Sequence, residues 1–418
     1  MIVQCGENME ARLAEYSRLA VRTGVNLRDG QPLVINSPIE CADFARRLAR
    51  EAYSAGAKDV TIVWTDEQFS RLRFEMASTE ALGIYPDWRR RLYMDNAADD
   101  AAIISVHAEN PEAFLGVAPE RLAAAQQAAG EALLEYRARI MSNKNAWCVV
   151  SVPTEAWARK VFADKDDSDA VDALWEAILS TVRVTGDGEA EARWKRHTDF
   201  LRRASDFMNA KAFESLHYTN ELGTKLTIRL PEGHIWAGGA EETQSGRVFV
   251  ANLPTEEIYT LPHREGVDGV VVATKPLVFQ GNLITGIRLR FEAGKVVSYE
   301  AKQGKAHLAK LIETDEGSAR LGEVALVPYD SPISKSGILF YNTLFDENAS
   351  CHLAFGKAYP TCLKGGADMD TLTLLSHGVN DSLLHEDFMV GSRDLSITGK
   401  TRDGMEIPVF RNGNFVDF

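Results

Sequence analysis

The sequence has no excess of basic residues. Among its 418 residues, 60 Asp and Glu outnumber 46 Lys and Arg, and the formal net charge is −14 at pH 7. A protein of this charge repels a phosphate backbone, and no basic run along the chain offsets that repulsion. We therefore expect no nucleic acid among its partners.

Long hydrophobic runs are also missing. No stretch of about 18 apolar residues, the length that can cross a bilayer, occurs in the sequence. Residues 1–7 lack the basic region and apolar core of a secretory signal. We therefore expect no membrane partner and a cytoplasmic location.

Cysteine is scarce. The chain has five cysteines, an odd number, with no C-x-x-C spacing. This usage is typical of reduced thiols, and not of a disulfide framework or a thiolate zinc site. We expect most of them to be small core residues. They are Cys5, Cys41, Cys148, Cys351 and Cys362.

The first half of the chain alternates short apolar runs with helical patterns. Runs this short and rich in β-branched residues are typical of strands buried on both faces of a parallel sheet. Apolar residues at spacings of three and four predict the helices. The predicted strands are residues 33–36, 60–64, 103–106 and 148–152, and the predicted helices are residues 42–57, 119–141, 170–184 and 189–209.

We therefore predict an α/β domain with a mainly parallel sheet over residues 1–186, ending in the turn at residues 185–188. The length of the chain also favours two domains. The first domain lacks G-x-G-x-x-G and G-x-x-x-x-G-K-[ST], so a Rossmann-like fold here carries no nucleotide signal. We interpret it as a supporting domain.

The second half has a different pattern. Polar and apolar residues alternate over residues 226–230, 287–291 and 296–300, between turns that contain glycine. Such alternation is typical of antiparallel strands with one exposed face. Together with a helix over residues 305–313, it predicts an α+β domain rich in antiparallel strands over residues 187–418.

His385 and Asp387 are candidate metal ligands. On a strand, residues two apart project from the same face, and an imidazole and a carboxylate so placed can share a divalent cation. A solvent-exposed polar edge strand explains the same spacing. Glu323 shares its strand face with Ala325 and Val327, and a charge there is costly unless it is paired or bound to a metal. It is therefore either a solvated edge residue or a ligand.

Two further pairs are ambiguous. Glu256 and Glu257 precede a loop, where such pairs are usually solvent-facing. Cys351 adjoins His352, but neighbours on a strand point to opposite faces, so packing is favoured over a nucleophilic role for Cys351.

Five blocks of sequence, in this order, resemble the thermophilic metallo-aminopeptidase family (M29), which contains the aminopeptidase T and PepS-like enzymes. The resemblance extends over the whole length of the chain. The blocks are residues 252–257 (NLPTEE), 274–277 (TKPL) with 281–284 (GNLI), 321–328 (LGEVALVP), 347–356 (ENASCHLAFG) and 385–391 (HEDFMVG).

This resemblance implies a peptide hydrolase that removes N-terminal residues through two divalent metal ions, with the second domain as the catalytic one. Zinc or cobalt is the family expectation, and the ligand types also accept manganese or magnesium. The substrates would be short peptides with a free N-terminus, and the assembly a homodimer. The implied metal ligands are Glu257 (with Glu256 as the alternative), Glu323, His352, His385 and Asp387.

The resemblance also implies catalytic roles. Tyr359 matches the family's catalytic tyrosine and would donate a hydrogen bond to a developing oxyanion or assist proton transfer. Its alternative is an aromatic residue packed in a loop before Pro360. Glu257 and Glu323 are the expected catalytic carboxylates, and Glu257 is the hypothesised bridge between the ions.

Two other functions stay open at this point. A mononuclear iron dioxygenase that opens a hydroxylated pyridine ring would use two histidines and one carboxylate. A non-catalytic protein that binds metal or peptide would hold the ions without turnover. The two glutamates, giving five ligands in all, favour the two-metal hydrolase.

Overall fold

The computed structural model describes residues 7–108, 110–279 and 282–418, so Cys5 and Gly281 lie outside the described residues. The chain divides into two compact units. The first contains the described part of Met1–Arg196 with Ala240–Pro254 and Leu339–Asn342, and the second contains His197–Gly239, Thr255–Ile338 and Thr343–Phe418. The change of unit after Arg196 lies ten residues beyond the predicted boundary at residue 186, and the supporting and catalytic roles of the two domains stay predictions.

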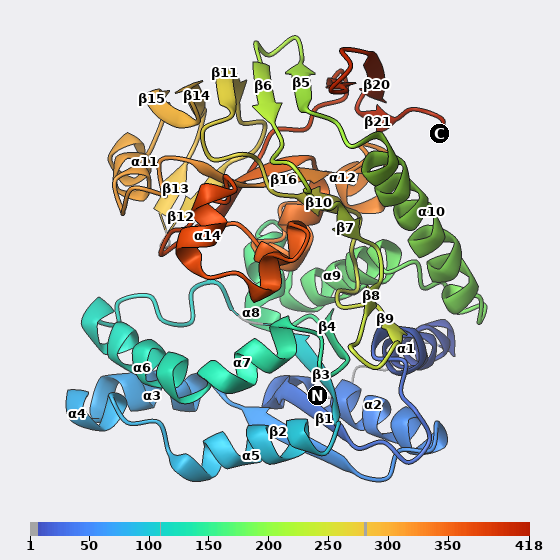
Figure 1. The fold of residues 1–418 in the computed structure, drawn as a ribbon. Coiled ribbons are helices and arrows are strands. Elements are labelled where there is room, and N and C mark those ends of the chain that lie inside the picture. Colours follow the sequence, from blue (N-terminus) through green and yellow to red (C-terminus); the bar gives the residue numbers. More distant parts are fainter. Residues whose placement is uncertain (1–6, 109, 280–281) are drawn as a thin grey trace. The chain divides into compact units, whose positions relative to one another are not determined.

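Four parallel strands form the sheet of the first unit, in the order β2-β1-β3-β4 (Figure 1). This confirms the predicted parallel sheet. The later segment Ala240–Pro254 bonds to β4 through the peptide groups of Val149. The strands of this unit are β1 (Leu33–Pro38), β2 (Val60–Thr65), β3 (Ala102–His107), β4 (Trp147–Ser151), β8 (Glu241–Glu242) and β9 (Val248–Phe249).

The helices of the first unit differ from the prediction in two ways. The helix predicted over residues 119–141 is interrupted at Leu133, where φ is −103° and ψ is 13°. Helices α1, α3, α4, α5 and α8 were not predicted, and two of them, α3 and α5, bury almost no side chain and so lack a strong apolar period. The helices are α1 (Glu7–Leu19), α2 (Ala42–Ser54), α3 (Glu67–Met76), α4 (Thr79–Leu82), α5 (Asp87–Ala98), α6 (Pro119–Ala132), α7 (Leu134–Met141), α8 (Glu155–Val161) and α9 (Asp167–Thr181), with short helical turns at Ala20–Gly24 and Ile39–Cys41.

Two antiparallel sheets build the second unit, which confirms the predicted second-half pattern. One has the strand order β18-β17-β16-β10-β7 and the other β15-β14-β11-β6-β5-β19-β20-β21. The first of these contains β7 (Ala237–Gly238), β10 (Ile258–Thr260), β16 (Leu321–Leu326), β17 (His352–Gly356) and β18 (His385–Met389). The second contains β5 (Ser215–Thr219), β6 (Lys225–Arg229), β11 (Val267–Val272), β14 (Arg288–Glu292), β15 (Lys295–Glu300), β19 (Ser396–Lys400), β20 (Glu406–Arg411) and β21 (Asn414–Phe415).

Alternating burial explains why these strands were visible in the sequence. In β14, Leu289 and Phe291 are buried while Arg288 and Arg290 are exposed. Strands β16 and β17, in contrast, are buried along their whole length. This unit also contains the hairpin β12 (Leu277–Phe279) and β13 (Asn282–Ile284), the helices α11 (Lys305–Ile312), α12 (Pro332–Ser336), α13 (Thr343–Asp346) and α14 (Thr371–Ser376), and the 3₁₀ turns η3 (Glu347–Ala349), η4 (Pro360–Cys362) and η5 (Gly366–Asp368). Helix α10 (Ala190–Lys211) contains the residue at which the unit changes.

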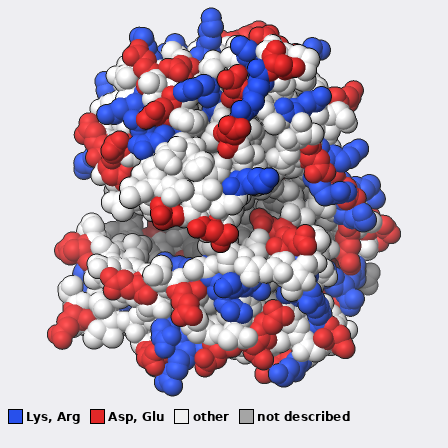
Figure 2. Space-filling model, viewed as in Figure 1, with Lys and Arg blue, Asp and Glu red and all other residues white. Residues whose placement is uncertain are grey.

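Charge is mixed on the surface. On the face drawn in Figure 2, Lys and Arg side chains lie among Asp and Glu side chains. None of the helices in the described ranges is long and apolar enough to cross a membrane.

Candidate metal centre

The register of the five-stranded sheet gathers polar side chains on one face. Residues directly opposite each other in an antiparallel pair point to the same side. Ala354 of β17 lies between Glu323 of β16 and Asp387 of β18, so these two carboxylates share a face. His352 lies two residues from Ala354, and His385 two residues from Asp387, which adds both imidazoles to that face.

A small residue shapes β16 beside this face. The pairing of β16 with β17 is irregular between Leu321 and Glu323. A Cβ on the intervening Gly322 would lie 2.3 Å from the carbonyl oxygen of Gly356, so only glycine allows the two strands to approach here. Bulges of this kind are common next to active sites, where they re-aim a side chain.

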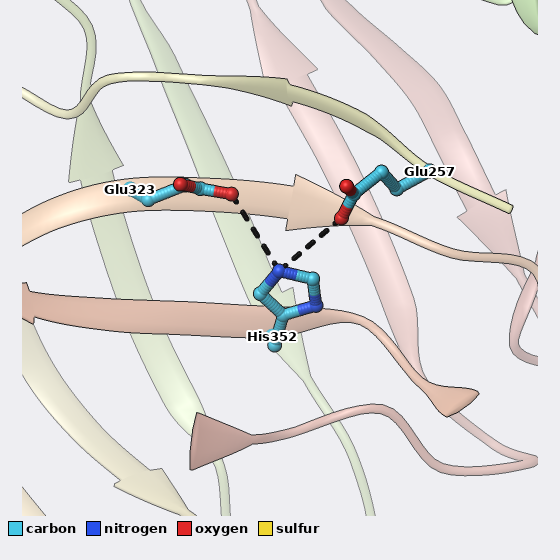
Figure 3. A group of neighbouring side chains, drawn as sticks. All are labelled: Glu257, Glu323 and His352. Atoms are coloured by element: carbon cyan, nitrogen blue, oxygen red, sulfur yellow. Dashed lines mark ion pairs between the residues drawn. The ribbon is translucent and has the colours of Figure 1, made fainter. Parts of the chain in front are cut away.

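Three of the predicted ligands form a buried group. His352 Nε2 lies 3.3 Å from Glu257 Oε2 and 3.5 Å from Glu323 Oε1 (Figure 3). The imidazole points between the two carboxylates, which come from the segment before β10 and from β16. The ligand atoms of all three residues lie within 4.8 Å of one another, as the donors of one metal ion would.

A second group shares Glu323 with the first. His385 Nε2 lies 3.3 Å from Glu323 Oε2 and 3.6 Å from Asp387 Oδ1. The two oxygens of Glu323 therefore face one histidine each. This geometry favours Glu323 as the bridging carboxylate, in place of the sequence-based hypothesis for Glu257, which belongs to the first group alone.

Backbone carbonyls orient both imidazoles. His352 Nδ1 lies 3.2 Å from the carbonyl oxygen of Ser350, and His385 Nδ1 lies 2.7 Å from that of Lys357. A carbonyl can only accept, so each Nδ1 donates its hydrogen and each neutral ring keeps the Nε2 lone pair for a ligand. Metal-binding histidines are typically held in this way.

The group also perturbs the pKa of each imidazole. Burial alone would lower the pKa of His352, but the hydrogen bond to Glu323 and the charges of Glu257 and Asp387 raise it to about 10. Burial would also lower the pKa of His385, but the hydrogen bonds to Asp387 and Glu323 raise it to about 11. The site therefore attracts positive charge strongly.

The carboxylates respond in opposite directions. Burial raises the pKa of Glu257 to about 7. Burial acts the same way on Glu323, but hydrogen bonds to His352 and His385 lower its pKa to about 2. Glu323 is thus the carboxylate held most firmly in its charged form, as a ligand between two cations requires.

Two buried oxygens that make no hydrogen bond show that these residues suit a metal. Among the described residues, Glu257 Oε2 and Asp387 Oδ1 make only the ion-pair contacts of 3.3 and 3.6 Å with His352 and His385. Buried carboxylate oxygens are costly unless a donor or a cation satisfies them. The donor set of carboxylate oxygen and imidazole nitrogen accepts zinc, cobalt, manganese or magnesium.

The structure distinguishes between Glu256 and Glu257. Glu256 is 2% exposed, and its Oε2 lies 3.5 Å from His197 Nε2 of α10, whereas Glu257 lies in the group with His352. His197 Nε2 also lies 2.7 Å from the carbonyl oxygen of Thr255, to which it donates a hydrogen bond.

Tyr359 lies beside the second group. Its ring centroid is 5.0 Å from that of His385 and 6.0 Å from that of Tyr259. Burial, assisted by the charges of Glu323 and Asp387, raises the pKa of Tyr359 well above its usual value. The phenol therefore keeps its proton and can donate a hydrogen bond.

Cys351 lies away from this chemistry. It is 1% exposed, and its Sγ lies 3.3 Å from both the N and the O of Val327. Burial raises the pKa of its thiol to about 12, which suppresses the nucleophilic thiolate. These contacts support packing as its role.

Two residues near the site carried no prediction. Burial and the charges of Glu257 and Asp387 raise the pKa of Glu347 well above its usual value, which favours the neutral, protonated form of this further carboxyl group beside the site. Asn348 is fully buried and accepts a hydrogen bond from the N–H of Glu256. Both lie in the block that contains His352, which was the available signal, but spacing alone gives them no partner.

Comparison with known proteins identifies the family of this chain. Residues 9–415 match the family described as thermophilic metalloprotease (M29). Aminopeptidase 2 of Geobacillus stearothermophilus is 48% identical over 406 residues, which are 97% of this chain and 98% of that protein. The chain belongs to the M29 family. This confirms the resemblance seen in the five blocks of sequence.

The fold agrees with that of an M29 enzyme. The solved structure of wild-type AmpT from Thermus thermophilus matches with a TM-score of 0.91 at 40% identity, over 98% of this chain and 100% of that one. A 2,5-dihydroxypyridine dioxygenase from Pseudomonas putida KT2440 matches with a TM-score of 0.53 at 11% identity, over 99% of this chain and 98% of that one. At that identity the likeness extends to the fold alone.

Proposed function

We propose that Glu257, Glu323, His352, His385 and Asp387 form a two-metal centre with which this chain removes N-terminal residues from short peptides. Family membership makes the chain a metal-dependent aminopeptidase, hence a peptide hydrolase. One observation supports the two-metal centre in particular. The two oxygens of Glu323 face His352 and His385 at 3.5 and 3.3 Å, so one carboxylate serves two groups of ligands.

Each residue has a proposed task. Glu257 and His352 complete the first group, and His385 and Asp387 complete the second, with Glu323 common to both. Two divalent ions bound there would lower the pKa of a water molecule toward neutrality and polarise the scissile carbonyl. The charge of Glu323 would offset the repulsion between the ions.

The chain supplies the remaining polar groups. Tyr359 would donate its phenolic hydrogen to the oxygen of the scissile carbonyl as negative charge develops there. Its contact with the His385 ring supports this placement. Glu257 and Glu323 are the proposed catalytic carboxylates. Glu323 would act by joining the two ions, and Glu257, whose pKa burial raises to about 7, would accept the proton of the attacking water.

Several finer properties remain predictions. We propose zinc or cobalt as the metal, with manganese or magnesium as alternatives, and a homodimer as the assembly. We also propose a cytoplasmic location, which the four described cysteines support because all are buried free thiols.

The test removes and restores the metal. Chelation should abolish hydrolysis of leucine-p-nitroanilide, zinc or cobalt should restore it, and the restored protein should contain two ions per chain. One ion per chain, with oxygen uptake on 2,5-dihydroxypyridine and no amide cleavage, would favour the dioxygenase alternative. Bound metal without turnover of either substrate would favour the non-catalytic alternative.

A further inference from the structure

Glu257 is held differently from the other four ligands. Glu323, His352, His385 and Asp387 lie within strands, where ladder hydrogen bonds fix the backbone. Glu257 comes one residue before β10, whose pairing begins at Ile258 with Leu326. Residues 255–257 belong to no strand or helix, so the sheet does not fix the approach to Glu257.

Two side chains hold the peptide group that joins Thr255 to Glu256. Its N–H donates to Asn348 Oδ1 at 2.7 Å. Its carbonyl oxygen accepts from His197 Nε2 at 2.7 Å. One peptide plane is therefore bonded at both edges, which restricts the backbone torsions on either side of it and with them the direction of Glu257.

Asn348 is itself fixed. Its side chain is fully buried, and Nδ2 donates to the carbonyl oxygen of Leu344 at 3.1 Å. The reversed amide would turn Nδ2 toward the N–H of Glu256, donor against donor, so only one orientation satisfies both neighbours. Asn348 lies four residues before His352, and its amide thus joins the segments that carry two ligands of the first group.

We propose that Asn348, together with His197, positions Glu257 for the metal ion of the first group by holding the Thr255–Glu256 peptide at both edges. This inference rests on the proposed two-metal function. Neither residue touches the reacting atoms. Their effect should therefore be on the binding of one ion, with little on the other, because His385 and Asp387 are held by β18.

The experiment is a titration of metal-free protein with Co²⁺ or Zn²⁺, followed by calorimetry and, for Co²⁺, by its visible spectrum. Glu257→Ala identifies the binding step that belongs to the first group. Asn348→Ala should weaken that same step by about 10- to 100-fold, the usual effect of removing a residue that orients a ligand. The other step should stay within about twofold of wild type.

A matched control separates positioning from general destabilisation. Asn145, in the first unit, is equally buried and bonds the carbonyl oxygens of Ala97 and Ala101. Asn145→Ala should lower the thermal midpoint and leave both metal-binding steps unchanged. If Asn348→Ala is folded and binds both ions as wild type does, or weakens both steps equally, the positioning role is wrong.

His197 provides a second test if Asn348→Ala does not fold. His197→Gln keeps a side-chain donor for the Thr255 carbonyl, whereas His197→Ala removes it. We expect His197→Ala to weaken the first-group step and His197→Gln to restore most of it. Equal binding by wild type and both variants would contradict the proposal, while a wild-type protein that binds fewer than two ions would contradict the proposed function instead.

Discussion

The two halves of the proposed metal centre differ in burial and in origin. In the first, the side chains of His352 and Glu257 are 2% and 12% exposed, and they come from β17 and from the segment before β10. In the second, His385 and Asp387 are 23% and 16% exposed and lie on one strand, β18. Glu323 joins the halves. One half is thus assembled from distant segments and is more buried, and the other is a local strand motif nearer to solvent.

The largest effect on metal binding and hydrolysis should follow from removing the charge of Glu323, the carboxylate that the two halves share. Glu323→Gln keeps the size of the side chain but loses the charge that faces both histidines, so we expect both binding steps to weaken. Hydrolysis of leucine-p-nitroanilide should fall by roughly 10³- to 10⁶-fold, as when one member of an interdependent catalytic set is lost.

Glu300→Gln, an exposed change on β15, is the matched control and should keep wild-type turnover. Near-normal hydrolysis by Glu323→Gln would mean that the centre has been assigned to the wrong carboxylate.

The same difference explains what the sequence could predict. Both proposed ligands of the second half were candidates by spacing, because residues two apart on a strand must share a face. The parallel and antiparallel sheets followed from runs of apolar residues and from alternation. The position of Glu257 could not be predicted from such patterns, because the peptide group before it is held by residues far away in the sequence. Asn348 is 92 residues from Glu256, and His197 is 58 residues from Thr255.

The bridging role that we propose for Glu323, in place of Glu257, could not be predicted from the sequence for a related reason. It depends on where each oxygen of Glu323 points, and that direction is set by the pairing of β16 with β17, which is irregular at Gly322. The sequence pattern and the family resemblance indicated the candidate ligands, but they gave no distances between the ligand atoms.

The second-largest expected effect is on the stability of the metal-free protein, which should fall more for a substitution in the first half than for one in the second. His352→Ala leaves Glu257 and Glu323 buried without the imidazole that lies 3.3 and 3.5 Å from them, and breaking a buried pair costs about 3–5 kcal/mol. His385→Ala should cost less, because solvent reaches that half and screens the remaining charges. Urea unfolding with chelator at pH 7 measures both, and equal losses would contradict the difference in burial.

Tyr359 should affect only turnover. Tyr359→Phe keeps the ring against His385 but removes the hydroxyl, so we expect kcat to fall by about 10²-fold, typical of losing one oxyanion donor. Both metal-binding steps should be unchanged. A matched change, Tyr299→Phe on β15, should leave kcat unaltered. If Tyr359→Phe lost metal instead of turnover, its role would be structural support of the second half.

The last prediction concerns pH. Without metal, the pKa of His352 is about 10 and that of His385 about 11, so both imidazoles carry a proton at pH 7 that a metal ion must displace. Apparent affinity should therefore rise with pH between 6 and 8, by about tenfold per pH unit for each proton displaced.

The same pKa shifts determine how the stability of the metal-free protein changes with pH. Because the folded-state pKa values are raised, the stabilisation of the metal-free protein is complete below about pH 6.5, the ordinary value for histidine, and is lost as pH rises through 10 to 11. Calorimetry in buffers of different ionisation enthalpy counts the released protons. Glu323→Gln should release fewer protons, since the charge of Glu323, which helps to raise both pKa values, is gone; an unchanged count would mean that Glu323 does not couple the two halves.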